Sequence, residues 1–100
     1  MFDIEKLINE LTLDEKISLL TGFNSWYSNK IPRLNIPSIK MSDGPNGVRG
    51  DSTSNKSSAC FPCPISIGST WNKKLIKKVG IALGEEARDN DVDVLLGPTI

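Results

Sequence analysis

Histidine is absent from this sequence of 100 residues, and cysteine occurs only twice, at Cys60 and Cys63. A structural zinc site needs four ligands, and no second pair of ligands accompanies these two cysteines. The two cysteines therefore predict no zinc site, and we expect no metal ion and no cofactor. The spacing Cys-Phe-Pro-Cys also fits a redox pair, but prolines flank Cys63 and the next periodic helix starts well beyond it. We interpret both cysteines as reduced thiols, with redox chemistry as a minor alternative.

Net charge is also lacking, because Lys and Arg number 12 and Asp and Glu number 12. This balance argues against a nucleic-acid-binding protein that relies on a large positive field. It does not exclude a local basic patch. No apolar run approaches the roughly 20 residues of a membrane span. Asp3 and Glu5 stand where a secretory signal has a basic start and an apolar stretch, so we expect a cytoplasmic protein.

A predicted strand that ends in a tight turn is the most informative feature present. Residues 38–42 alternate between polar and apolar, which predicts a short strand, and Asp43 follows directly. The pairs Gly44-Pro45 and Asn46-Gly47 are strong turn signals. In α/β folds this edge of a sheet is where ligands bind, and a carboxylate there can accept hydrogen bonds from hydroxyls. The alternative, which these residues alone favour, is that Asp43 only hydrogen-bonds its own turn.

Two short helices are predicted near the start of the chain. Asp3 can cap the first, whose apolar stripe repeats at helical spacing, and Thr12 with Glu15 forms a capping box for the second. The second helix is expected to end near Thr21, with Gly22 as its C-terminal cap. Residues 23–37 then read as a loop that contains Trp26. The Trp26 ring could pack against the apolar face of a sugar ring, but we favour the interpretation that it covers the end of the hydrophobic core.

The segment from 44 to 70 is predicted to be irregular, and its polar part, 51–58, to be a loop rather than a domain linker. A third helix begins after Asn72 and carries an apolar stripe. Gly80 and Gly84 lie one turn apart on a neighbouring face, a spacing that lets another backbone approach closely. Four lysines in the first half of this helix are interpreted as a solvated face. They are Lys73, Lys74, Lys77 and Lys78.

Residues 92–96 read as a buried strand that Gly97 and Pro98 end. The order strand, helix, strand predicts a β-α-β crossover and a parallel sheet. Two strands neither close a barrel nor bury both faces of a sheet. We therefore expect the chain to be the first part of something longer.

Several motifs in the same order resemble the N-terminus of glycoside hydrolase family 3, and within it the β-glucosidases. They are LTLDEKI at 11–17, LTG at 20–22, IPRLNIP at 31–37, SDGPNGVR at 42–49, CFP at 60–62 and LLGPT at 95–99. The resemblance implies that residues 1–100 are an α/β fragment, the N-terminal portion of a (β/α)8 TIM-barrel-like catalytic domain that is incomplete in this chain. It implies retaining hydrolysis of terminal, non-reducing β-D-glucosyl residues by two carboxyl groups.

The resemblance also implies roles for two residues of the turn. Asp43 matches the family aspartate that binds hydroxyls of the glucose ring, and Arg49 belongs to the same motif, where we expect it to brace the turn or a nearby carboxylate. The nucleophile and the acid/base residue would lie beyond position 100. The fragment alone is therefore expected to be inactive, and its substrate partner in the parent would be a β-glucoside or oligosaccharide.

A second hypothesis comes from another class of protein. The chain could be a small stand-alone α/β binding or interaction module without catalysis. A monomeric product of 100 residues that melts cooperatively would favour the module. We expect aggregation or partial folding instead, because the edges of the predicted sheet lie open.

Overall fold

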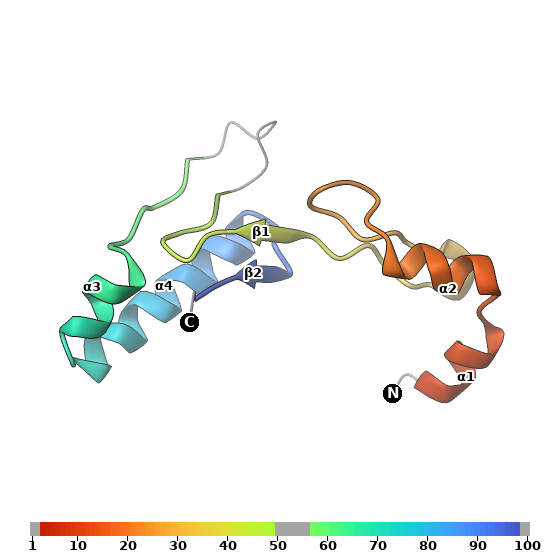
Figure 1. Cartoon of the computed structure of the whole chain (residues 1–100), viewed down its shortest axis with the longest axis horizontal. Helices are drawn as coiled ribbons and strands as arrows, with labels where there is room; N and C mark the ends of the chain where they lie inside the picture. Colours follow the sequence, from red (N-terminus) through yellow and green to blue (C-terminus); the bar gives the residue numbers. More distant parts are fainter. Residues whose placement is uncertain (1–2, 50–56, 99–100) are drawn as a thin grey trace. The chain divides into compact units, whose positions relative to one another are not determined.

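The computed structural model describes residues 3–49 and 57–98. The chain divides into two compact units, Met1–Ile39 and Lys40–Ile100 (Figure 1). The division therefore falls before the polar segment 51–58, most of which lies outside the described residues.

The first unit begins with the two helices that the sequence predicts. Helix α1 spans Ile4–Glu10 and helix α2 spans Leu13–Leu20. The Asp3 carboxylate accepts a hydrogen bond from the Lys6 N–H at 3.1 Å, and Thr12 and Glu15 form the complete capping box. These caps satisfy backbone N–H groups that have no partner inside a helix, so both helix starts follow from local sequence.

The end of α2 differs from the prediction. Thr21 is the C-terminal cap, with φ of −105°, and Gly22 pairs with Ser28 instead of capping the helix. The side-chain amide of Asn29 supplies hydrogen bonds to carbonyl groups at the end of the helix. Its Nδ2 donates to the Ser18 and Thr21 carbonyl oxygens at 2.9 and 3.1 Å. A Cβ on Gly22 would lie 2.7 Å from the Asn24 carbonyl oxygen. Glycine is thus needed here for close approach of the backbone, not for a left-handed cap.

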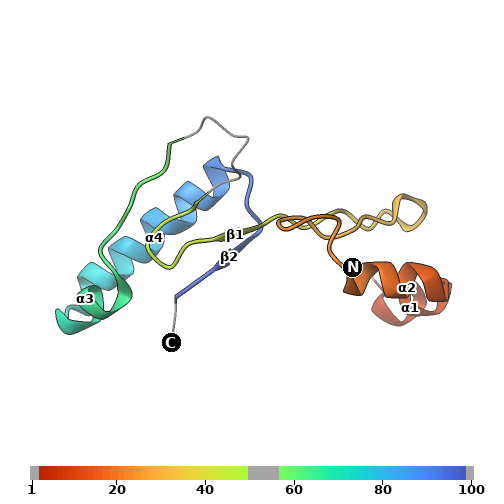
Figure 2. The same ribbon diagram turned by 45° about the horizontal axis from the view of Figure 1, so that its top comes forward.

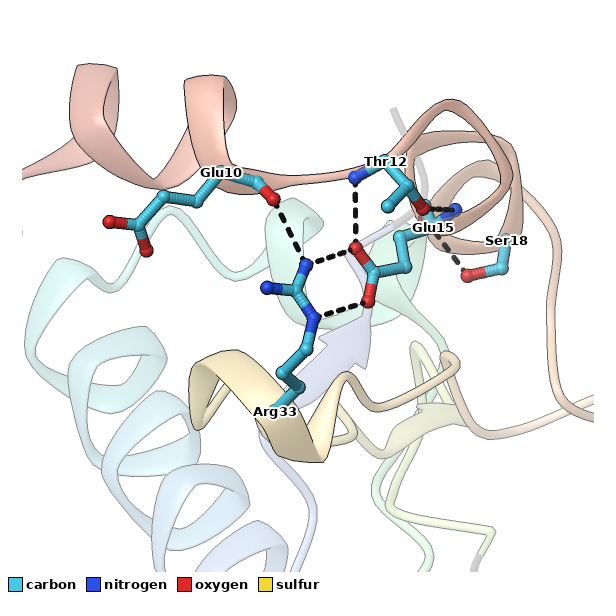
Figure 3. Close-up of polar contacts among 5 residues, drawn as sticks. All are labelled: Glu10, Thr12, Glu15, Ser18 and Arg33. Atoms are coloured by element: carbon cyan, nitrogen blue, oxygen red, sulfur yellow. Dashed lines mark hydrogen bonds and ion pairs between the residues drawn. The ribbon is translucent and has the colours of Figure 1, made fainter.

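A short 3-10 helix, η1, spans Pro32–Leu34 and supplies Arg33 to the two helices (Figure 3). The guanidinium donates from Nη2 to Glu15 Oε2 at 2.7 Å and from Nε to Glu15 Oε1 at 3.2 Å. Nη2 also donates to the Glu10 carbonyl oxygen, at the end of α1, at 2.9 Å. One side chain therefore joins α1, α2 and η1, and the Glu15 carboxylate also accepts from the Thr12 N–H.

This arrangement predicts a pH dependence for the first unit. Hydrogen bonds from Arg33, and secondarily from the Thr12 N–H, lower the pKa of Glu15 from 4.5 to about 2. Because the pKa is lower in the folded unit, the stabilisation is fully present above about pH 4.5 and is lost as the pH falls toward 2. In Arg33→Ala, an NMR titration of the Glu15 carboxyl carbon is expected to shift its midpoint back toward the ordinary value. An unchanged midpoint would contradict the assignment.

The second unit contains the parallel strand pair that the sequence predicts. Strand β1 spans Met41–Asp43 and strand β2 spans Val94–Leu96, with Met41 opposite Val94 and Asp43 opposite Leu96. Helix α4, Lys73–Asp89, connects them and runs alongside them (Figures 1 and 2). The Asn72 side chain caps α4 by accepting from the Leu75 N–H at 3.0 Å, as predicted.

Strand β2 is not buried, contrary to the prediction. Val94 and Leu96 are 41% and 47% exposed, because β1 is the only strand beside β2 in the part of the chain described. The fully buried side chains are those of Val48 and Ser42, in and just before the turn that follows β1. The most deeply buried side chains described in this unit therefore lie in β1 and in the turn that follows it, and Val92 and Asn90 near β2 are also buried.

A further helix, α3, spans Pro64–Ser69 in the segment predicted to be irregular. Proline suits the first turn of a helix because its N–H would have no partner there, so Pro64 starts this helix rather than preventing one. Cys63 is the residue before the helix, and both cysteines are free and exposed. A helix thus follows Cys63 directly, which corrects the expectation that the nearest helix lies well beyond it.

Candidate functional site

The candidate site lies where β1 ends. Asp43 is the last residue of the strand and stands opposite Leu96, the last residue of β2. The two parallel strands therefore end at the same edge of the sheet, where the prediction places Asp43. Its side chain is half-buried.

Backbone hydrogen bonds hold the turn after Asp43. The Arg49 N–H donates to the Asp43 carbonyl oxygen at 3.0 Å, and the Gly47 N–H donates to the Gly44 carbonyl oxygen at 3.3 Å. Gly44 and Gly47 have φ of 146° and 153°, a region that favours glycine. A Cβ on Gly44 would lie 1.4 Å from the Gly47 carbonyl oxygen. Only glycine therefore fits at position 44.

The segment 58–61 is hydrogen-bonded to the turn. The Phe61 N–H donates to the Asn46 carbonyl oxygen at 2.6 Å, and the Ser58 hydroxyl donates to the carbonyl oxygen of Val48. A Cβ on Gly47 would lie 2.1 Å from the Ala59 carbonyl oxygen. The second segment thus packs directly on the glycine backbone, which explains why position 47 carries no side chain.

Helix α4 anchors that second segment. The Glu86 carboxylate accepts a hydrogen bond from the Ala59 N–H at 3.0 Å. Sequence reasoning missed this contact, since a glutamate on a helix gives no signal that it will bind a loop 27 residues away. The contact connects the turn, through residue 59, to α4, the longest of the helices described.

The Asp43 carboxylate takes no part in holding the turn. Asp43 does hydrogen-bond its own turn, but through its carbonyl oxygen, which accepts from the Arg49 N–H and from the Ser42 hydroxyl at 2.9 Å. Within residues 3–49 and 57–98, no hydrogen bond or ion pair reaches its side chain. An ionised carboxylate at a strand end can accept hydrogen bonds from two hydroxyls at once.

Arg49 contributes to the turn through its backbone. Its side chain is exposed, and its guanidinium forms no ion pair with Asp43 or with any other acid in the described ranges. Arg49 therefore holds the turn through its backbone N–H, and the role expected of its side chain stays a prediction.

Two polar contacts fix the other end of the strand pair, and sequence reasoning missed both. The Asp93 carboxylate accepts from the Lys40 N–H at 2.8 Å, and Lys40 Nζ donates to the Asn90 carbonyl oxygen at 2.8 Å. These contacts join residues 50 or more positions apart, so no local pattern announces them. They engage Asp93 where β2 begins, at the end of the pair remote from Asp43.

Two other kinds of site are absent from the described part of the chain. The described residues include no group of three or more His, Cys, Asp or Glu side chains that could hold a metal ion. Among the same residues, no helix is long and apolar enough to cross a membrane.

Sequence comparison finds similar proteins over nearly the whole chain. A Schizosaccharomyces pombe protein named as a β-glucosidase is 56% identical over 99 residues, covering 98% of this chain. "Probable beta-glucosidase I" of Aspergillus fumigatus is 52% identical over 99 residues. The chain spans only 12% of the length of each of these relatives. No protein-family model matches the sequence.

Solved structures give the same result. The β-glucosidase of Kluyveromyces marxianus in complex with glucose has a TM-score of 0.92 and 41% identity, covering 98% of this chain and 12% of that one. β-Glucosidase 3B of Thermotoga neapolitana in complex with glucose has a TM-score of 0.84 and 31% identity, covering 97% and 16%. The GH3 β-glucosidase of Bifidobacterium adolescentis has a TM-score of 0.80 and 40% identity, covering 91% and 13%.

These matches agree with the order of motifs along the sequence and with the parallel strand pair. About half of the residues are identical to those of the S. pombe and A. fumigatus relatives over 99 residues. The similarity therefore extends well beyond the turn that carries Asp43. The matches confirm the resemblance to glycoside hydrolase family 3: over nearly its whole length, the chain matches the N-terminal part of β-glucosidases.

Proposed function

We propose that this chain is the first part of a (β/α)8-like barrel domain in a β-glucosidase, and that Asp43 binds hydroxyls of the glucose ring. The observation that carries the proposal is the Asp43 carboxylate at the shared end of two parallel strands, which accepts no hydrogen bond within residues 3–49 and 57–98, while the turn is held by backbone groups. Two of the similar structures are complexes with glucose. In folds with parallel strands, this edge is where ligands bind.

The role of Asp43 in the proposed reaction is orientation. Hydrogen bonds to an ionised carboxylate are shorter and stronger than those between neutral groups, and two of them fix both the position and the rotation of a sugar ring. A ring held in this way presents its anomeric carbon to the reacting groups in one geometry, which lowers the entropic part of the barrier. The backbone bonds of the turn keep the carboxylate in place before the sugar arrives.

The chemical step needs two further carboxyl groups. In the retaining mechanism, one attacks the anomeric carbon and the other protonates the leaving oxygen and later activates water. Following the family resemblance, both groups belong to polypeptide that follows residue 100. The chain by itself would therefore bind a sugar weakly at best and would not hydrolyse glucosides.

A chimera tests this function. The chain replaces its matching segment in the S. pombe relative, with which it shares 56% of its residues. We expect the purified chimera to hydrolyse an aryl β-glucoside at a rate comparable to that of the relative, whereas the chain alone has no activity. A chimera that folds but hydrolyses no β-glucoside would contradict the proposal, and so would hydrolysis by the chain alone.

A further inference from the structure

Ala59 is held between helix α4 and the turn that carries Asp43. Its N–H donates to the Glu86 carboxylate at 3.0 Å. Its carbonyl oxygen lies against the backbone of Gly47, where an added Cβ would come within 2.1 Å. One residue therefore contacts the helix with its donor and the turn with its acceptor. A shift of residue 59 away from α4 has to change its contact with the turn.

Glu86 differs from the other groups that hold the segment 58–61. The Ser58 hydroxyl and the Phe61 N–H both donate to carbonyl oxygens of the turn, so they join the two loops to each other. In the part of the chain described, the bond from Ala59 is the one that joins this segment to a helix. Its acceptor is a carboxylate, which makes a stronger hydrogen bond than a neutral oxygen does.

The same end of α4 also holds the start of β1. The Glu86 carbonyl oxygen accepts from the Asn90 N–H at 3.1 Å and from Asn90 Nδ2 at 2.9 Å. The Asn90 carbonyl oxygen accepts in turn from Lys40 Nζ at 2.8 Å, and Asn90 is only 7% exposed. Lys40 precedes Asp43 in the chain and Gly47 follows it. The last turns of α4 thus hold the chain on both sides of Asp43.

We propose that Glu86 is a positioning residue for sugar binding, which fixes the Asp43 carboxylate by way of Ala59 and the turn. The inference rests on the proposed role of Asp43. Glu86 acts through backbone contacts: its carboxylate binds residue 59, residue 59 packs on Gly47, and the Arg49 N–H at the end of the turn donates to the Asp43 carbonyl oxygen. Without the Glu86 carboxylate, the turn loses its connection to α4 and the Asp43 carboxylate is less often in place.

Kinetics of the chimera described above test the proposal. Glu86→Ala removes the acceptor but leaves a residue that favours helix, so α4 should persist. We expect kcat/KM for an aryl β-glucoside to fall by about tenfold to a hundredfold, the scale for misplacing a binding group by roughly 1 Å. Glu86→Gln keeps an acceptor oxygen at the same reach and should recover most of this loss. Glu86→Asp keeps the charge but has a shorter reach, and it should also lower kcat/KM.

Glu85→Ala is the matched control. It makes the same chemical change at the neighbouring position of α4, where the side chain is exposed and forms no hydrogen bond or ion pair within the described residues. The chimera with this substitution should have the kinetics of the unsubstituted chimera. An equal loss in Glu85→Ala and Glu86→Ala would show an effect on the helix as a whole and would overturn the proposal.

A double-mutant cycle separates positioning from general destabilisation. If Glu86 acts through Asp43, then Glu86→Ala should change kcat/KM of the Asp43→Ala chimera by less than about threefold. A merely structural role lowers the amount of folded enzyme, so it would reduce kcat by the same factor in both backgrounds and leave KM unchanged. Equal losses in the two backgrounds would therefore contradict the positioning role.

Hydrogen exchange of the same chimeras reports on the turn without substrate. Peptides over 44–49 and 57–61 should exchange about tenfold faster in Glu86→Ala and at an unchanged rate in Glu85→Ala. Unchanged exchange and kinetics in Glu86→Ala, beside a slow Asp43→Ala, would overturn this inference alone. Unimpaired kinetics in Asp43→Ala would instead overturn the proposed role of Asp43 and the inference with it.

Discussion

In the chimera, Asp43→Ala is expected to lower kcat/KM for an aryl β-glucoside by about 10²- to 10⁴-fold. The reason is the loss of two hydrogen bonds to an ionised acceptor, each contributing about 1.5–3 kcal/mol. The turn should survive the change, because its hydrogen bonds use the Asp43 carbonyl oxygen and not the carboxylate. Steady-state kinetics together with a melting curve separates lost binding of the sugar from lost folding.

Two further variants sharpen this prediction. Asp43→Asn keeps the shape and one acceptor oxygen but removes the charge, so its loss should be smaller than that of Asp43→Ala. Asp14→Ala removes an acid from the exposed surface of α2, at a position that forms no part of the proposed site, and should change the rate little. Wild-type kinetics in Asp43→Ala would remove Asp43 from the site.

Gly44→Ala should disrupt the turn after β1. The new Cβ would lie 1.4 Å from the Gly47 carbonyl oxygen, so the backbone has to move, and φ of 146° is itself unfavourable for alanine. Backbone strain of this kind costs on the order of 1–3 kcal/mol before the clash is counted. We expect the Arg49 and Phe61 amide protons, which donate within and to the turn, to exchange with solvent at least about tenfold faster.

Gly80→Ala is the matched control for this change. It makes the same chemical substitution inside α4, where the added Cβ meets nothing within 4 Å. In the 100-residue chain it should stabilise the helix by about 0.5–1 kcal/mol and leave the exchange of Arg49 unchanged. If Gly44→Ala behaved like Gly80→Ala, the turn would not depend on glycine and its geometry would not hold Asp43 in place.

The predictions from sequence succeed where a local hydrogen bond decides the structure. Asp3, Thr12 and Asn72 begin three helices as expected, since a cap needs only a side-chain oxygen and an N–H group three residues away. They fail where the same residue type has two uses. The segment 44–70 is predicted to be irregular, but Pro64 starts α3 within it, and Gly22 is predicted to be a cap but serves a close backbone approach.

For the candidate site, the sequence places Asp43 at a strand end followed by a glycine turn, and the structure agrees. The sequence does not reveal that the hydrogen bonds of the turn go to the Asp43 carbonyl oxygen and not to the Asp43 carboxylate. That distinction depends on the course of the backbone from 43 to 49, which turn signals alone do not specify. The bond from Glu86 to Ala59 is equally invisible, because it joins a helix to a distant loop.

By itself the sequence determined the starts of α1, α2 and α4, the β-α-β order and the family resemblance, because each depends on residues close together in the chain or on the order of several motifs. Only the tertiary structure decided the exposure of β2, the Arg33–Glu15 contact between helices and the contact of Glu86 with Ala59. The physical reason is that burial and long-range hydrogen bonds depend on which segments meet in space. Local propensity does not contain that information.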